Sequence, residues 1–158
     1  MSDYHGRDEL AELADRVDGW LANIAAGNPA IASIDRGTSD DTKSGEPRWF
    51  VRMRGEEKDV TTVWLTLGQR TLRYETYVMP APEENAAELY ENLLRRNERL
   101  VGAHFAIGVE DAVFLRGELP DVMLTEAELD RILGTLYATV EQCFRGLLRI
   151  GFAKRLAE

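Results

Sequence analysis

Side chains that could carry acid–base, nucleophilic or metal chemistry are few and scattered along this chain. His5 and His104 are its two histidines, and Cys143 is its one cysteine. A zinc site needs three or four such ligands close together, which this spacing does not support. No nucleophile-elbow sequence accompanies His104, so we expect an ordinary histidine at the edge of a sheet. The sequence predicts neither a metal site nor a cofactor.

Paired carboxylates are the next candidates for catalysis. All of them fall in predicted turns or helix starts, where acidic side chains are solvated, whereas a general acid needs a pKa raised by burial. A calcium-binding loop starting at Asp40 fits poorly, because Val51 stands where the closing glutamate is required. We therefore predict that the protein is not an enzyme. The pairs are Asp40/Asp41, Glu56/Glu57, Glu83/Glu84 and Glu110/Asp111.

Aromatic and arginine side chains form a stronger candidate, for a binding surface. Apolar and polar residues alternate over 48–54, 60–67 and 71–79, which is typical of an antiparallel sheet with one buried and one mixed face. Aromatic residues and arginine are enriched at the energetic centres of protein interfaces. The mixed face is therefore a candidate partner or dimer interface, unless a helix or the N-terminal segment covers it and makes its aromatics part of the core. If the strands pair in order, this face carries Phe50, Arg52, Arg54, Trp64, Arg73 and Tyr77.

Apolar residues at three- and four-residue steps predict three helices around these strands. The first begins at Ser2 or Asp8 and ends near residue 27, the second begins at Asn85, and the third covers 125–152. The other expected elements are a short strand over 30–35, an exposed loop over 36–46, and a hairpin made of 103–109 and 112–116.

The third helix has the clearest signals in the chain. Thr125 and Glu128 form a capping box, in which the hydroxyl accepts a backbone N–H and the carboxylate reaches back to the amide of the cap residue. Its apolar stripe predicts a wall of the core. Gly134 and Gly146 weaken the helix interior or permit the close approach of another element. Cys143 is predicted to be a small buried apolar residue rather than a reactive thiol.

Length and composition favour a single domain over 1–158, with an ordered core over about 8–152 and flexible termini. Of the 158 residues, 44% are hydrophobic and 30% are charged. The net charge of -9 argues against a nucleic-acid-binding surface and against docking on anionic membranes. No apolar run is long enough to cross a bilayer, so we expect a cytoplasmic protein. In so acidic a chain, the cluster of Arg95, Arg96 and Arg99 is typical of a solvated helix face.

The predicted order is helix, strand meander, helix, hairpin and helix. Its signals lie in WFVRMRGEEKDVTTVWLTLGQRTLRYETYVM, in NAAELYENLLRRNERLVGAHFAIGVEDAVFLRGELP and in the final helix, and Arg116, Gly117 and Glu118 form a turn before the helix that Thr125 opens. This pattern resembles the type III secretion chaperone-like fold and, within it, the YbjN-like bacterial family. The resemblance spans about 10–152. It implies an α+β fold with an antiparallel meander sheet flanked by three helices.

Secretion chaperones of this fold are small, acidic and usually dimeric, and they hold an extended client segment along apolar grooves. YbjN-like members are linked to regulation or stress physiology. The resemblance therefore implies a protein-binding module, chaperone-like or regulatory, that holds a client or partner segment and forms a homodimer. The rival hypotheses are a small-ligand-binding sensory module and an enzyme without a recognisable motif, which a deep polar pocket around His104 would favour.

Overall fold

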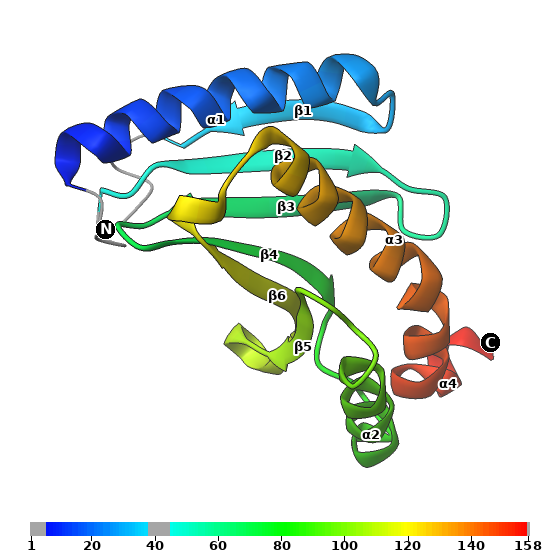
Figure 1. Cartoon of the computed structure of the whole chain (residues 1–158). Helices are drawn as coiled ribbons and strands as arrows, with labels where there is room; N and C mark the ends of the chain where they lie inside the picture. The colour runs from blue at the N-terminus through cyan, green and yellow to red at the C-terminus, as the bar shows by residue number, and fades with distance from the viewer. Residues whose placement is uncertain (1–5, 38–44, 158) are drawn as a thin grey trace.

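The computed structural model describes residues 6–37 and 45–157, and leaves residues 1–5, 38–44 and 158 undescribed. Within the described residues, six antiparallel strands form one sheet in the order β1-β2-β3-β4-β6-β5 (Figure 1). The α+β architecture predicted from the sequence is thus confirmed. The strands are β1 (Ile31–Arg36), β2 (Arg48–Arg54), β3 (Val60–Leu67), β4 (Thr71–Met79), β5 (His104–Ile107) and β6 (Val113–Pro120).

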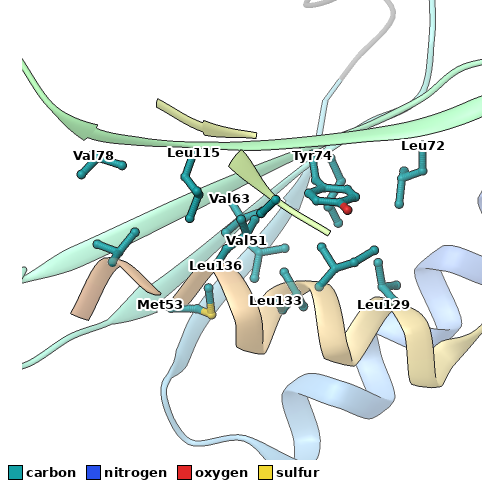
Figure 2. Packing of buried hydrophobic residues seen from close by; sticks show 14 of the residues in the cluster. Val51, Met53, Val63, Leu72, Tyr74, Val78, Leu115, Leu129, Leu133 and Leu136 are labelled. Carbon is teal, nitrogen blue, oxygen red and sulfur yellow. The ribbon is translucent and has the colours of Figure 1, made fainter. Parts of the chain in front are cut away.

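Helices cover one face of this sheet. The helices are α1 (Arg7–Gly27), α2 (Ala86–Asn97), α3 (Glu126–Gly151) and the short α4 (Ala153–Leu156), with 3-10 turns at Val109–Asp111 and Asp121–Met123. Figure 1 shows α1 and α3 lying across the same side of the sheet, with α2 beside the far end of α3. Inward side chains of the central strands and of α3 meet in a single core (Figure 2).

The three central strands have the boundaries that the sequence predicts. Their strict period-two alternation places buried side chains such as Val51, Val63 and Leu65 toward the helices. Val51 pairs with Val63, and Leu65 pairs with Tyr74, so the buried faces of the three strands are in register. Of the predicted loop over 36–46, residues 38–44 lie outside the described part of the chain.

The hairpin extends the sheet rather than standing apart from it. Its second strand, β6, pairs antiparallel with β4 along almost the whole length of both strands, and β5 forms the edge. The sequence predicts this hairpin about Glu110 and Asp111, and both residues have positive φ in the turn. The second strand runs four residues beyond the predicted end, to Pro120.

The start of α3 confirms one half of the predicted capping box. The Thr125 hydroxyl accepts the backbone N–H of Glu128 at 3.1 Å. The Glu128 carboxylate instead accepts from the guanidinium of Arg131, at 2.7 and 3.1 Å, because an ion pair with a charged neighbour competes with the cap amide. The close-approach reading of Gly134 and Gly146 is wrong, since a Cβ at either position would meet no atom within 4 Å.

Caps of the other helices differ from the prediction. α1 begins at Arg7 with Gly6 as its cap residue, without a side-chain cap bond; Asp8 lies in its first turn, and Ser2 is among the undescribed residues. Asn85 precedes α2 in a left-handed conformation (φ 54°) and makes no cap bond. Its side-chain amide donates to the Ile150 carbonyl at 3.0 Å instead, so the loop before α2 satisfies the end of α3.

Candidate protein-binding face of the sheet

One face of the sheet has no helix packed on it in the described part of the chain. The buried residues of α1, α2 and α3 belong to the core on the opposite face. Phe50, Trp64 and Tyr77 are half-buried and are neither part of that core nor packed against it. The alternative that a helix makes these aromatics ordinary core residues therefore fails for the helices described. We call this surface the outer face.

The aromatic side chains of the outer face lie on neighbouring strands. Phe50 on β2 is paired directly with Trp64 on β3, and Trp64 is paired with Glu75 on β4. Tyr77 lies two residues beyond Glu75 and therefore on the same face of β4. Its ring makes an edge-to-face contact with Phe114 of β6, with centroids 5.6 Å apart. The aromatic strip thus crosses four strands.

The predicted arginines flank this strip, and two of them are paired. Arg52 forms an ion pair with Asp35 of β1, and Arg73 pairs with Glu46 at 2.8 Å. Arg54 is exposed at the end of β2, and its backbone carbonyl accepts the Tyr137 hydroxyl at 2.9 Å. All six residues predicted for this site therefore come from the same side of β2, β3 and β4.

Four further residues belong to the outer face, and the sequence analysis did not include them. The Arg48 guanidinium lies 5.4 Å from the Phe50 ring centroid and 6.0 Å from that of Trp64. Arg116 pairs with Glu75 at 2.8 Å and stacks at 4.7 Å on Phe114, which is only 4% exposed. Arg48 and Glu75 share the strand alternation of Phe50 and Tyr77 and could have been found; Phe114 and Arg116 become neighbours only through the β4–β6 pairing.

A half-buried lysine, Lys58, lies at one end of the strip. The Lys58 ammonium lies 5.2 Å from the Tyr77 ring centroid and donates to the Tyr77 carbonyl at 2.5 Å. Burial lowers the pKa of Lys58. Burial, and then the negative charge of Glu110, raises the pKa of Tyr77, so its phenol stays protonated near neutral pH. This end of the outer face is therefore a hydrogen-bonding aromatic surface rather than an acid–base pair.

Residues with possible catalytic chemistry are dispersed in the structure. His104 is exposed at the start of the edge strand β5. Cys143 is 1% exposed in α3, and burial raises the pKa of its thiol to about 11, which confirms its prediction as a buried apolar residue. In the described ranges no three His, Cys, Asp or Glu side chains are grouped to hold a metal ion. His5, Asp40 and Asp41 lie outside those ranges.

Two of the other acidic pairs, Glu56/Glu57 and Glu83/Glu84, take part in contacts with α3 and α4. Glu57 pairs with Arg145, and the backbone N–H groups of Glu56 and Glu57 both donate to Glu141. Glu83 accepts from Arg155 at 2.5 Å, while Glu84 accepts the backbone N–H of Lys154. Glu57 thus ties the turn between β2 and β3 to α3, and Glu83 and Glu84 hold α4.

The same arrangement of elements occurs in a solved structure. A chain of the heterodimeric complex ExoU-SpcU, from the type III secretion system of Pseudomonas aeruginosa, superposes with a TM-score of 0.52 and 15% identity. The match covers 83% of this chain and 96% of that one. At this identity the likeness shows the fold, and it confirms the type III secretion chaperone-like fold that the sequence predicts.

Curated relatives of this chain include mycobacterial proteins that are named as uncharacterized. An uncharacterized protein of Mycobacterium tuberculosis (strain ATCC 25618 / H37Rv) is 33% identical over 106 residues, which are 67% of this chain and 58% of the relative. An uncharacterized protein of Mycobacterium leprae (strain TN) is 31% identical over 105 residues, 66% of this chain and 57% of the relative. The match thus spans less than two thirds of the length of these relatives.

Among the described helices, none is both long and apolar enough to cross a membrane.

A family model matches most of the chain. The model, YbjN, is described as "Putative bacterial sensory transduction regulator" and matches residues 33–149. This range begins in β1 and ends in α3, and so contains the whole outer face. The family resemblance stated from the sequence is confirmed: this chain belongs to the YbjN family.

Proposed function

We propose that the outer face binds a segment of a protein partner and that the chain works as a regulatory or chaperone-like adaptor without catalysis of its own. The observation that carries this proposal is the strip of half-buried aromatics, Phe50, Trp64 and Tyr77, on a sheet face that none of the described helices covers. Such residues gain free energy when a partner removes them from water.

The charged side chains that flank the aromatic strip are compatible with coverage of the outer face by a partner. Arg52 and Arg73 are already held by carboxylates, so covering them leaves no unpaired charge. In the described part of the chain, the Nε of the half-buried Arg48 has no hydrogen-bond partner. A partner segment with apolar side chains and a carbonyl or carboxylate acceptor opposite Arg48 would satisfy both parts of the surface. A cytoplasmic setting, in which the Cys143 thiol stays reduced, belongs to this proposal.

Crosslinked pull-down from the native host tests the proposal. Wild type is compared with Phe50→Ser/Trp64→Ser and with the matched control Leu94→Ser/Val101→Ser. The control residues are apolar, lie away from the sheet, and are 69% and 79% exposed. We expect a protein partner that is recovered with wild type and with the control and lost with the outer-face variant. Equal recovery with both variants, or no partner at normal abundance, would contradict the proposal.

A homodimer through the same face is the more specific form of this proposal. Two copies that face each other would bury two aromatic strips and two copies of Arg48. Sedimentation velocity of the purified chain separates this case from an adaptor that stays monomeric until its partner binds. If the outer face is the dimer contact, Phe50→Ser/Trp64→Ser sediments as a monomer and the control variant stays dimeric.

A further inference from the structure

A positively charged groove lies away from the outer face, between the end of α2, the middle of α3 and the edge strand β5. It has a volume of about 510 Å³, and three of its lining residues are Arg95, Arg96 and Arg99. Its polar wall on α3 is formed by Thr139 and Gln142. The sequence analysis expects this arginine cluster to be a solvated helix face, and Arg95 and Arg99 are indeed exposed, while Arg96 is half-buried; all three also line a groove with polar groups from a second helix.

Two of the three guanidinium groups have no carboxylate partner within the described residues. Arg95 lies 3.7 Å from Glu91, in an exposed pair. Arg96 donates its Nε to the neutral amide oxygen of Asn92 at 2.7 Å, and Arg99 has no side-chain partner in this part of the chain. Two positive charges without a carboxylate partner in the described residues therefore line one groove, on a chain whose net charge is -9.

The groove is held in shape by its surroundings. The bond to Asn92 fixes the direction of the Arg96 guanidinium and leaves its terminal nitrogens for another acceptor. Asn97 joins α2 to β5, because its side chain accepts the Phe105 N–H at 2.6 Å and donates to the Phe105 carbonyl at 3.2 Å. Phe105 and Leu100 supply the apolar part of the wall. Arg95 and Arg96 are thus held on α2, while Arg99 and Leu100 lie in the turn that follows it, which the Asn97 bonds tie to β5.

We propose that this groove binds a small organic phosphate. Guanidinium groups bind phosphate oxygens with paired, charge-assisted hydrogen bonds, which suits Arg96 and Arg99. Gln142 and Thr139 offer further donors from α3, and Leu100 and Phe105 provide a surface for the carbon part of the ligand. The site is separate from the outer face and does not depend on the proposed function.

Calorimetric titration with inorganic phosphate, pyrophosphate and AMP tests the proposal, with adenosine as the uncharged probe. We expect saturable binding of AMP or pyrophosphate with a Kd of about 1 mM or tighter, weakened by added salt. Adenosine should not bind, because the phosphate supplies the contacts to arginine. Stronger binding of AMP than of pyrophosphate would show that the carbon part of the ligand contributes.

Arg96→Gln/Arg99→Gln should weaken this binding at least about tenfold. The matched control Arg7→Gln/Arg16→Gln removes the same charge from exposed positions of α1. Because Arg96 also offsets the negative end of the α2 dipole, its loss is expected to lower Tm slightly, so circular dichroism must first show that both variants are folded. Amide shifts confined to 92–105 and 139–142 in a two-dimensional NMR titration would locate the ligand. No saturable binding of any phosphate probe, or equal weakening in both variants, would overturn the proposal.

Discussion

Gly134 and Gly146 lower the stability of α3, and the absence of a side chain at these positions does not allow closer packing against another element. Both lie inside α3, and a Cβ at either position would stand in open space. Replacement by alanine removes backbone freedom from the unfolded chain, so Gly134→Ala and Gly146→Ala should each raise the free energy of unfolding by about 0.5–1 kcal/mol. Urea denaturation monitored by circular dichroism measures this change.

Gly117 is the matched contrast. A Cβ there would clash with the Gly102 carbonyl oxygen and with the Tyr74 ring across the β4–β6 pair. Gly117→Ala is therefore expected to destabilise the protein in the same assay. A loss of stability in the α3 variants would mean that these positions are covered in solution.

Arg48 makes a second prediction at the scale of one residue. Its guanidinium lies over Phe50 and Trp64, a geometry that a planar group meets and an ammonium does not. Arg48→Lys keeps the charge but should lower the free energy of unfolding by about 0.5–1 kcal/mol and weaken recovery of the partner. Arg16→Lys, at an exposed position of α1, is the control and should change neither. Equal effects of the two substitutions would show that only charge matters at position 48.

Glu141 ties two elements together. Its carboxylate on α3 accepts the backbone N–H groups of Glu56 and Glu57 at 2.9 Å, and of Lys58 at 3.4 Å, in the β2–β3 turn. Burial alone would raise the pKa of the Glu141 carboxyl, but these three donors together hold the pKa below its ordinary value. The turn is thereby anchored to the helix across the end of the core.

A pH dependence follows from this anchor. A carboxyl with a lowered pKa contributes stability above its unfolded pKa, near 4.5, and loses it as the pH falls through the folded value. Glu141→Gln should therefore be less stable than wild type by about 1 kcal/mol at pH 7, a figure kept small by partial exposure. The difference should shrink below pH about 4.5. Urea titrations at several pH values measure it, and a difference independent of pH would contradict the assigned role.

The elements themselves were largely predictable, for local reasons. Strands β2, β3 and β4 alternate strictly and are bracketed by turn residues, so their boundaries follow from the sequence. The role of Thr125 also follows, because a cap hydroxyl acts on an amide three residues away. The roles of Glu128 and Asn85 did not, since Arg131 and Ile150 compete for their side chains. A local sequence pattern does not show which of several possible hydrogen-bond partners a side chain takes.

At the scale of the molecule, the prediction of the site was limited because the sequence does not show which strands pair when they are far apart in the chain. Phe50, Trp64 and Tyr77 come from consecutive strands, and their shared face follows from alternation. Phe114 and Arg116 join them only because β6 pairs with β4 rather than standing apart as a hairpin. The groove at Arg96 likewise forms where α2 meets α3, a packing that neither helix encodes alone. The β6 part of the outer face and the whole groove therefore needed the three-dimensional structure.

Cys143 allows the cooperativity of the whole fold to be measured. It is the one cysteine of the chain and packs in the core shared by helices and sheet. A thiol reacts as the thiolate, and here burial both raises its pKa to about 11 and blocks access. Labelling by a thiol reagent at pH 8 therefore requires opening of the core. We expect it to be about a thousandfold slower than in the unfolded chain, or slower still.

Variants with altered stability turn this measurement into a test of whether the protein unfolds as one cooperative unit. If Cys143 becomes accessible only by global unfolding, Gly134→Ala should slow labelling by the factor that its gain in unfolding free energy predicts, and Glu141→Gln should speed it in the same way. Cys143→Ala provides the blank, and the chain in concentrated guanidinium gives the unfolded rate. If neither substitution changes the labelling rate, Cys143 lies in a part of α3 that opens without global unfolding. The long helix would then not unfold together with the sheet that it covers.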